Sequence, residues 1–172
     1  MNQKLLFGAI VLVLLIGLIL LALQYWIAGG IITVIGGVLL FFVWRLWMIL
    51  RISEAMAKQD FELAKRHMAS IKNPEKLNDY SKTYYSFFKG MLETQENNFK
   101  GAEASFRKAL EVNRFRAPDE KATSHLMLAQ LQLRKRNRQG ARRHLQEAKS
   151  LTSNPQILDQ IKSLVKQARI RL

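Results

Sequence analysis

The feature that most constrains this chain is a pattern of small and large apolar residues that recurs between residues 61 and 148. In the segment 99–109 a phenylalanine, an alanine, a second phenylalanine and a second alanine stand at relative positions 0, 3, 7 and 10, and the segment 61–71 has apolar residues at the same offsets. The anchoring alanines Ala64, Ala102 and Ala141 are 38 and 39 positions apart. Such offsets place residues on one face of an α-helix, and a period of this size is typical of arrays of paired helices. We therefore expect an all-α chain whose second half is a stack of helical pairs.

The pattern resembles that of the tetratricopeptide repeat (TPR) family. In that family a small residue lies midway along the first helix of each pair, and an aromatic residue, an alanine, a large apolar residue and an alanine follow in the second helix. The residues that carry the resemblance are Gly90, Phe99, Ala102, Phe106 and Ala109 in the middle unit, and Ala129, Ala141, Leu145 and Ala148 in the next, where Gln139 replaces the aromatic residue. The resemblance implies that these are packing residues, since small side chains let antiparallel helices approach and large ones fill the space between pairs.

The resemblance implies a short TPR-like α-solenoid with units at about 52–74, 80–114 and 119–153 and a C-terminal capping helix at 155–171. The period exceeds the family's roughly 34 residues, so longer turns are needed, and Asn73–Pro74 and residues 117–120 are suited to form them. Asn154 is the expected N-cap of the last helix and Pro155 its first residue. The alternative for this helix is a basic amphipathic segment lying on a membrane surface, which would use its lysines and arginines: Lys162, Lys166, Arg169 and Arg171.

The first fifty residues contain only two charged side chains, Lys4 and Arg45. Residues 5–23 are an unbroken apolar run, and a second run extends from 31 to 50 with Arg45 as its only charged residue. A helix of this length crosses the roughly 30 Å of a bilayer's hydrocarbon. The sequence therefore predicts a transmembrane hairpin in residues 1–50, with spans at about 5–27 and 31–50, before a repeat domain at 51–172. A cleaved signal peptide is the weaker hypothesis, because the run is too long and no small-residue cleavage site follows.

The positive charges predict the orientation of this hairpin. The connection between the two apolar runs contains no lysine or arginine, whereas Lys4 precedes the first run and Arg51 and Lys58 follow the second. Positively charged flanks remain on the cytoplasmic side. We therefore expect an integral protein of the cytoplasmic (inner) membrane, with both termini and the repeat domain in the cytoplasm.

Residues with the chemistry of an active site are scarce. The chain has no cysteine, which excludes disulfides, thiolate zinc sites and cysteine nucleophiles. Its three histidines, His67, His125 and His144, fall in different predicted helices, without a partner at the spacing of a metal site. No phosphate-binding loop, dinucleotide fingerprint or nucleophile elbow occurs. We expect no enzyme, no metal and no cofactor.

The first helix of each pair lines the concave face of a TPR array, so the resemblance implies that a protein client binds there. Tyr84 and Arg134 are the residues most expected to be exposed, because they combine contact area with a polar end. The candidate contacts are Tyr84, Phe87, Met91, Thr123, Leu126, Gln130 and Arg134. The predicted function is that of a membrane-anchored adaptor or assembly factor, and the sequence is compatible with a homo-oligomer. A structural accessory subunit of a membrane complex is an alternative.

Positive charge is concentrated near the C-terminus, where residues 121–172 carry a net charge of +10. Its densest part is a basic patch made of Arg134, Lys135, Arg136, Arg138, Arg142 and Arg143. Such a run is usually a solvated turn, but its field can attract anionic lipid, RNA including ribosomal RNA, or an acidic protein. RNA is the less favoured of these partners, since no aromatic residues for base stacking are interleaved with the basic ones.

Overall fold

The computed structural model describes residues 8, 11–13, 15–16, 19 and 26–170, apart from the side chains of 26–29 and 42–46. All regular elements among these residues are helical and none of the described residues lies in a strand, so the all-α class is confirmed. The chain divides into two compact parts, residues 1–51 and 52–172.

Helix α2 (Trp26–Ala57) contains the predicted second span, whereas the predicted first span lies largely outside the described residues. Within the part of the chain that the structure describes, no helix is long and apolar enough to cross a lipid bilayer. The predicted location in the cytoplasmic membrane is therefore wrong, and so is the predicted second span at about 31–50. The prediction considered only the hydropathy of two runs, but α2 continues beyond the second run through Arg51, and Ile52, Ala55 and Met56 are buried.

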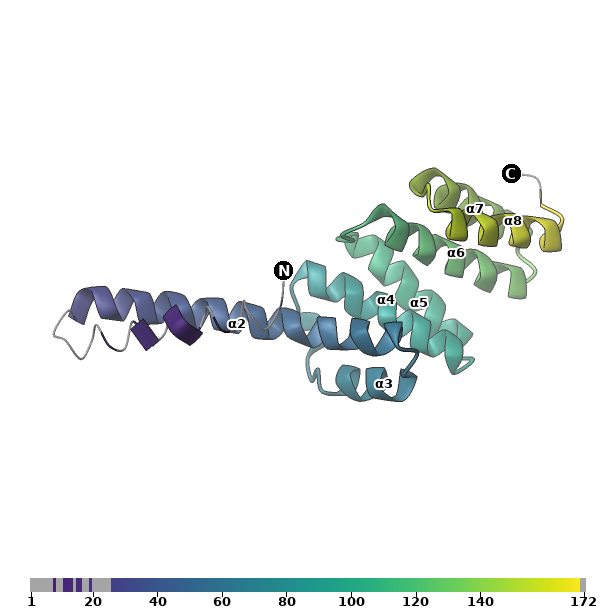
Figure 1. Ribbon diagram of the computed structural model, residues 1–172. Helices are drawn as coiled ribbons and strands as arrows, with labels where there is room; N and C mark the ends of the chain where they lie inside the picture. Colours follow the sequence, from purple (N-terminus) through teal and green to yellow (C-terminus); the bar gives the residue numbers. More distant parts are fainter. Residues whose placement is uncertain (1–7, 9–10, 14, 17–18, 20–25, 171–172) are drawn as a thin grey trace. The chain divides into compact units, whose positions relative to one another are not determined.

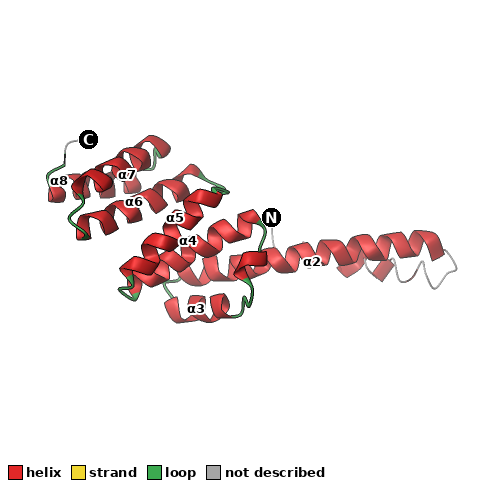
Figure 2. Ribbon diagram, turned by 180° about the vertical axis from the view of Figure 1, so that it is seen from behind, coloured by secondary structure: helices red, strands yellow, loops and turns green. Residues whose placement is uncertain are grey.

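The second part contains six further α-helices and one 3₁₀ turn among its described residues. These elements are α3 (Phe61–Ala69), η1 (Pro74–Lys76), α4 (Asp79–Gln95), α5 (Phe99–Val112), α6 (Pro118–Arg134), α7 (Arg138–Leu151) and α8 (Pro155–Ala168). Helix α4 packs along α5, and α6 packs along α7, so that two antiparallel pairs lie next to each other (Figures 1 and 2). The pairs meet where α5 packs against α6.

One turn geometry occurs three times, between α2 and α3, between α4 and α5, and between α6 and α7. In each turn the second residue has a left-handed backbone, with φ of 57° at Gln59, 60° at Asn97 and 59° at Arg136. The next residue is the N-cap of the following helix, and its backbone N–H donates to the carbonyl five positions earlier over 2.8–3.0 Å. Its side-chain oxygen accepts from the backbone N–H three residues later, as N-caps do; the three caps are Asp60, Asn98 and Asn137.

The three turns have the same periodicity as the sequence pattern. Their left-handed residues are 38 and 39 positions apart, which are the spacings of Ala64, Ala102 and Ala141. Each of these alanines has no solvent-exposed surface. The residue pattern and the backbone therefore repeat in the same register, so a position in one pair has a structural equivalent in the next.

The residues with the repeat pattern form the interior of the pairs. Gly90 lies against the fully buried ring of Phe106, and a Cβ atom at Gly90 would be 3.0 Å from three carbons of that ring. Phe106 also makes an edge-on contact with Phe87, at 6.2 Å between ring centroids. Phe99 is partly exposed, and the other pattern residues are buried: Ala102, Ala109, Ala129, Ala141, Leu145 and Ala148.

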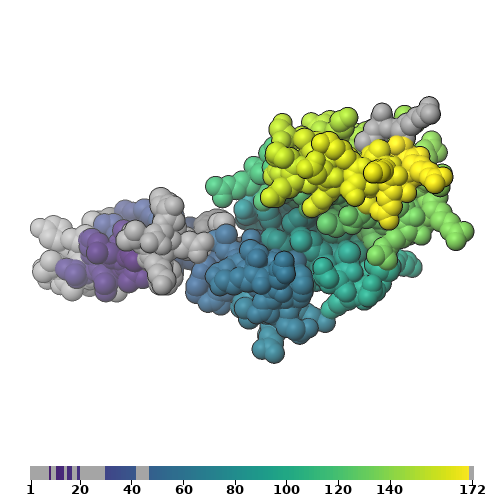
Figure 3. Space-filling model, turned by 45° about the vertical axis from the view of Figure 1, so that its right-hand side comes forward, coloured from purple at the N-terminus to yellow at the C-terminus, as the bar shows by residue number. Residues whose placement is uncertain are grey.

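Helix α8 packs against α6 and α7 at one side of the helical stack, where its surface is visible in Figure 3. Pro155 is its first residue and the side chain of Asn154 accepts from the N–H of Gln156 at 3.0 Å, so the predicted start of the helix is confirmed. Its Ile161 is buried in a cluster with Leu126 and Leu145. The apolar stripe of α8 is thus used for packing against the last pair.

The contact of Gly90 with Phe106 leads to a stability prediction. Gly90→Ala adds a methyl group where the ring cannot move away, because Phe106 is fully buried and is held by Phe87. The strain of overpacking outweighs the better helix propensity of alanine, so we expect a loss of about 1–2 kcal/mol in the free energy of unfolding. Urea denaturation followed by circular dichroism measures this loss. Gly37→Ala is the matched control, since its Cβ would meet no atom within 4 Å, and an equal loss in both variants would contradict the prediction.

Candidate functional site

Two polar grooves lie one repeat apart in the second part of the chain. The first groove has a volume of about 180 Å³ and is lined by Pro74, Glu75, Lys82, Tyr85, Ser86, Lys89, Ala104, Ser105 and Lys108. The second groove has a volume of about 430 Å³ and is lined by Arg107, His125, Gln132, Asn137, Gly140, Arg143, His144 and Glu147.

The two grooves occupy equivalent places in successive helical pairs. Four lining positions of the first groove recur one repeat later in the second, namely Ser86 and His125, Ala104 and Arg143, Ser105 and His144, and Lys108 and Glu147. Residues one repeat apart occupy corresponding places in the two helical pairs, because the turns before α5 and α7 have the same geometry. Each of the two helical pairs, α4–α5 and α6–α7, therefore contributes a groove at the corresponding place.

Basic side chains outnumber acidic ones on both grooves. The first groove has three lysines and one carboxylate, Glu75, whose Oε1 is 2.7 Å from the Nζ of Lys108. This hydrogen bond from Lys108 lowers the pKa of Glu75. The second groove has Arg107 and Arg143 against Glu147. A ligand that carries negative charge therefore matches both grooves.

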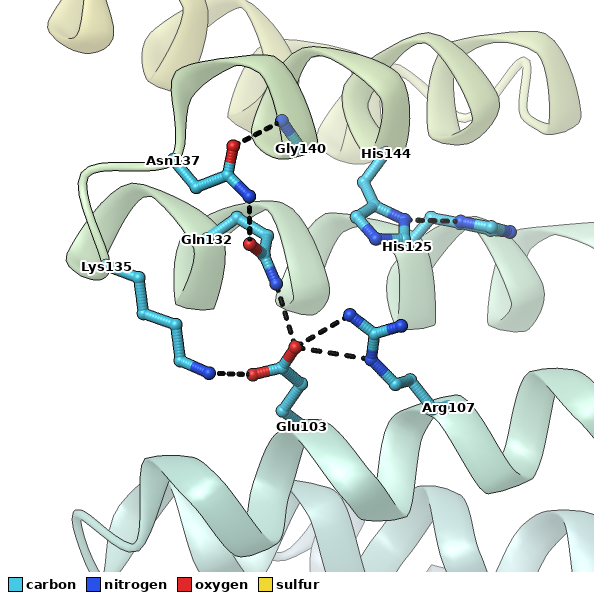
Figure 4. A network of polar contacts seen from close by, with 8 residues as sticks. All are labelled: Glu103, Arg107, His125, Gln132, Lys135, Asn137, Gly140 and His144. Atoms are coloured by element: carbon cyan, nitrogen blue, oxygen red, sulfur yellow. Dashed lines mark hydrogen bonds and ion pairs between the residues drawn. The ribbon is translucent and has the colours of Figure 1, made fainter.

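Glu103 of α5 is the centre of a polar network beside the second groove (Figure 4). Its Oε1 accepts from Nη2 of Arg107 at 2.8 Å and from Nε2 of Gln132 at 2.9 Å, and its Oε2 accepts from Lys135. The hydrogen bond from Lys135 is the main cause that lowers the pKa of Glu103, with a further contribution from Arg107. Glu103 thus fastens α5 to α6 and to the turn that follows α6.

The network continues from Gln132 into the start of α7. Oε1 of Gln132 accepts from Nδ2 of Asn137 at 2.8 Å, and Oδ1 of Asn137 accepts from the backbone N–H of Gly140 at 2.9 Å (Figure 4). A Cβ at Gly140 would come within 2.6 Å of Nδ2 of Asn137. Glycine at this position therefore lets one asparagine cap α7 and contact α6 at the same time.

The ion pair between Glu103 and Lys135 has a counterpart of opposite polarity one repeat earlier. There Lys65 of α3 donates to Oε1 of Glu96, the residue that follows α4, at 2.5 Å. Lys65 precedes Glu103 by one repeat, and Glu96 precedes Lys135 by one repeat. The two salt bridges therefore join equivalent positions. The same place between successive units thus has a salt bridge in both cases, but with its signs exchanged.

His125 of α6 and His144 of α7 face each other across the second groove. Their Nδ1 atoms are 3.2 Å apart and their ring centroids 5.4 Å apart, with the rings inclined by 40° (Figure 4). The Nδ1 of one neutral ring therefore donates to the Nδ1 of the other. The equivalent residues of the first groove are Ser86 and Ser105.

Burial holds the pKa of both imidazoles below the usual value of histidine. Burial lowers the pKa of His125 to about 4, and the neighbouring His144 adds to this effect. Burial also lowers the pKa of His144, with Arg107 as the next cause. Neutral rings can accept hydrogen bonds or bind metal ions, which charged rings cannot do.

Clusters of potential ligands for metals are otherwise small. Among the described residues, no group of three or more histidine, cysteine, aspartate or glutamate side chains is arranged to hold a metal ion. The chemistry that the two grooves offer is hydrogen bonding and charge, which is suited to binding.

Several of the predicted client contacts lie in the interior. Tyr84, Phe87 and Leu126 are 6%, 7% and 0% exposed, so the expectation that Tyr84 is exposed was wrong. Its hydroxyl donates to Glu120 and accepts from the backbone N–H of Arg116 at 2.9 Å, which ties α4 to the start of α6. Burial, more than the contact with Glu120, raises the pKa of Tyr84.

The other predicted client contacts reach the surface. Met91 of α4 and Gln130 of α6 are partly exposed and occupy equivalent positions in successive pairs, and Thr123 is also partly exposed. Arg134 is exposed, as predicted, and its guanidinium lies 4.2 Å from the centre of the Phe99 ring. This cation–π contact joins the end of α6 to the start of α5.

All six residues of the basic patch are exposed, and some of them also have partners in the structure. Lys135 is bound to Glu103, Arg134 lies over Phe99, and Arg143 lines the second groove. Arg136 has the left-handed backbone of the turn. The remaining members, Arg138 and Arg142, are exposed on α7. The positive patch therefore extends into the second groove.

The sequence prediction missed the grooves and the pair of histidines, although the sequence contains a signal for them. The turn at Lys135–Asn137 fixes the register of α6 against α7, so residues at equal distances before and after the Arg134–Lys135 peptide bond can face each other. Gln132 and Asn137 are one such pair, and His125 and His144 are another. The spacing of histidines within single helices could not reveal a contact made between helices.

Comparison of the chain with protein-family models, with curated proteins and with solved structures found no match.

The position of Glu103 leads to a prediction about pH. Because the pKa of Glu103 is lower in the folded chain than in the unfolded chain, its stabilising effect is present above the unfolded pKa of about 4.3 and is lost as the pH falls through the folded value. We expect Glu103→Gln to lower the free energy of unfolding by about 1 kcal/mol at pH 7, and to flatten its decline between about pH 5 and pH 3. Denaturant titrations across this pH range measure both effects. Glu111→Gln, at an exposed position of the same helix, should change neither, and the same flattening in that control would contradict the assignment.

Proposed function

We propose that this chain is a non-catalytic scaffold of TPR-like helical pairs that binds an acidic, extended segment of a partner protein along its two grooves. The observation that carries the proposal is the equivalence of the grooves, which recur one repeat apart with four aligned lining positions. A partner in extended conformation can place successive side chains in successive grooves, which is how repeat proteins use their regular surfaces.

The charge of the grooves supports an acidic partner. Lys82 and Lys89 line the first groove, and Arg107 and Arg143 line the second. Arg138 and Arg142, which are exposed on the same helix as Arg143, add to the positive charge. Carboxylates that enter these grooves would form charge-assisted hydrogen bonds, which are stronger than those between neutral groups.

The sequence pattern supports the TPR-like description. The small residues Gly90 and Ala102 and the large residue Phe106 are buried at the positions where the family has packing residues. Nucleic acid is the competing ligand class, because the same positive charge attracts phosphates. We favour a protein partner because no aromatic residue is interleaved with the arginines and lysines of residues 134–143.

Site-specific photo-cross-linking in cells tests the proposed function. A photoreactive amino acid is placed at Ala104 in the first groove and at Arg143 in the second, and at Lys149 and Lys166 as exposed positions that line neither groove. We expect the same protein adduct from Ala104 and Arg143 and its absence from Lys149 and Lys166. Mass spectrometry identifies the adduct. Equal labelling at all four positions, or adducts with RNA alone, would contradict the proposal.

Charge reversal tests the acidic nature of the partner. The triple variant Lys82→Glu, Lys89→Glu and Arg143→Glu changes basic residues that line the grooves. We expect it to lower the yield of the adduct from Ala104 at least tenfold, which corresponds to about 1.4 kcal/mol. The matched control changes Arg114, Lys149 and Lys166, which are exposed elsewhere, to glutamate and alters the net charge equally. If both triple variants lose the adduct to the same extent, only the overall charge matters and the grooves are not the site.

A further inference from the structure

The two histidines of the second groove are spaced like two ligands of one metal ion. Zinc binds imidazole nitrogen at about 2.0–2.1 Å, so two such nitrogens on one ion are about 3.3–3.4 Å apart at the tetrahedral angle and about 2.8–3.0 Å apart at a right angle. The Nδ1 atoms of His125 and His144 are 3.2 Å apart, between these two limits. A small outward movement of the rings would replace their shared proton by a metal ion.

The surroundings of the histidine pair contain charges of both signs. Charged groups face the pair from three helices: Glu103 and Arg107 of α5, Lys121 of α6, and Arg143 and Glu147 of α7. Arg107 is bound to Glu103 over 2.8 Å, which offsets both of their charges, and Glu147 carries negative charge against the positive charges of Lys121 and Arg143.

We infer that His125 and His144 form a binding site for one divalent transition metal ion, with zinc as the reference ion and nickel and copper as further candidates by their affinity for imidazole. The two Nδ1 atoms are the protein ligands. The groove of about 430 Å³ beside them has room for the water molecules that complete the coordination. The site is independent of the proposed client, because it rests on the geometry of α6 and α7 alone.

The neighbourhood of the pair supports the site. Glu147 lines the same groove and stands three residues after His144, hence on the same side of α7. Its carboxylate offers oxygen, a further ligand type for zinc. A bound ion would join α6 to α7 through coordination bonds, so it would stabilise this helical pair by mass action.

The test is a titration of the full chain with zinc or nickel chloride, measured by isothermal calorimetry and by the melting temperature. We expect one saturable site per chain and a melting temperature that rises by several degrees at saturation. His125→Ser and His144→Ser place at each position the residue type that the preceding repeat has at the equivalent one, Ser86 and Ser105. Each variant should lower the affinity at least tenfold and abolish the rise in melting temperature.

His67→Ser is the matched control, because it removes the only other histidine of a chain that has no cysteine. This variant should bind the metal like the wild type. Circular dichroism shows whether the two groove variants are folded, and if one is not, the other provides the test alone. The inference is overturned if the wild type shows no saturable site, or if its affinity is unchanged in a folded His125→Ser or His144→Ser variant.

Discussion

The helical pairs of this chain depend on a short turn in which one residue has a left-handed backbone and the next caps the following helix. The left-handed residue reverses the chain, and the cap satisfies backbone N–H groups at the start of the next helix that would otherwise lack a partner. Gln59, Asn97 and Arg136 are not glycines, so each turn has a modest backbone cost that the surrounding contacts offset. Because the geometry is the same each time, the register of one pair is also the register of the next. The grooves, the buried alanines and the facing histidines all follow from this register.

Much of the repeat could be predicted from the sequence because its packing residues are constrained by size. Only small side chains fit where helices cross closely, so the positions of Gly90, Ala102 and Ala141 are visible as a pattern in the sequence. Caps such as Asn154 are recognisable for a similar reason, since few residue types can satisfy the first N–H groups of a helix. The client contacts were harder to predict. Tyr84 has a polar end, which suggested exposure, but its hydroxyl found partners in Glu120 and the backbone of Arg116.

The membrane prediction and the missed contact of His125 have one physical cause, which is that a linear pattern does not show what covers a side chain. Hydropathy alone predicted membrane spans, and the described helices contain none that could cross a bilayer. Helical spacing alone found no partner for His125, whose partner is on another helix. What covers an apolar helix and what contacts His125 both depend on tertiary contacts. These contacts can be inferred from the sequence only when the turns that set which helices face each other are known.

The exchanged signs of the two salt bridges between units have a consequence for how such a chain can lengthen. Repeat proteins commonly grow by copying one unit in tandem, which works when the joining surfaces of a unit match each other. A second copy of the middle pair would bring Glu103 of the first copy opposite Glu96 of the second, since these residues are the equivalents of the partners in each bridge. Two carboxylates would then meet where the present chain has opposite charges. The order of the units is thus encoded in their polarity, and duplication of a unit would need a compensating change of charge.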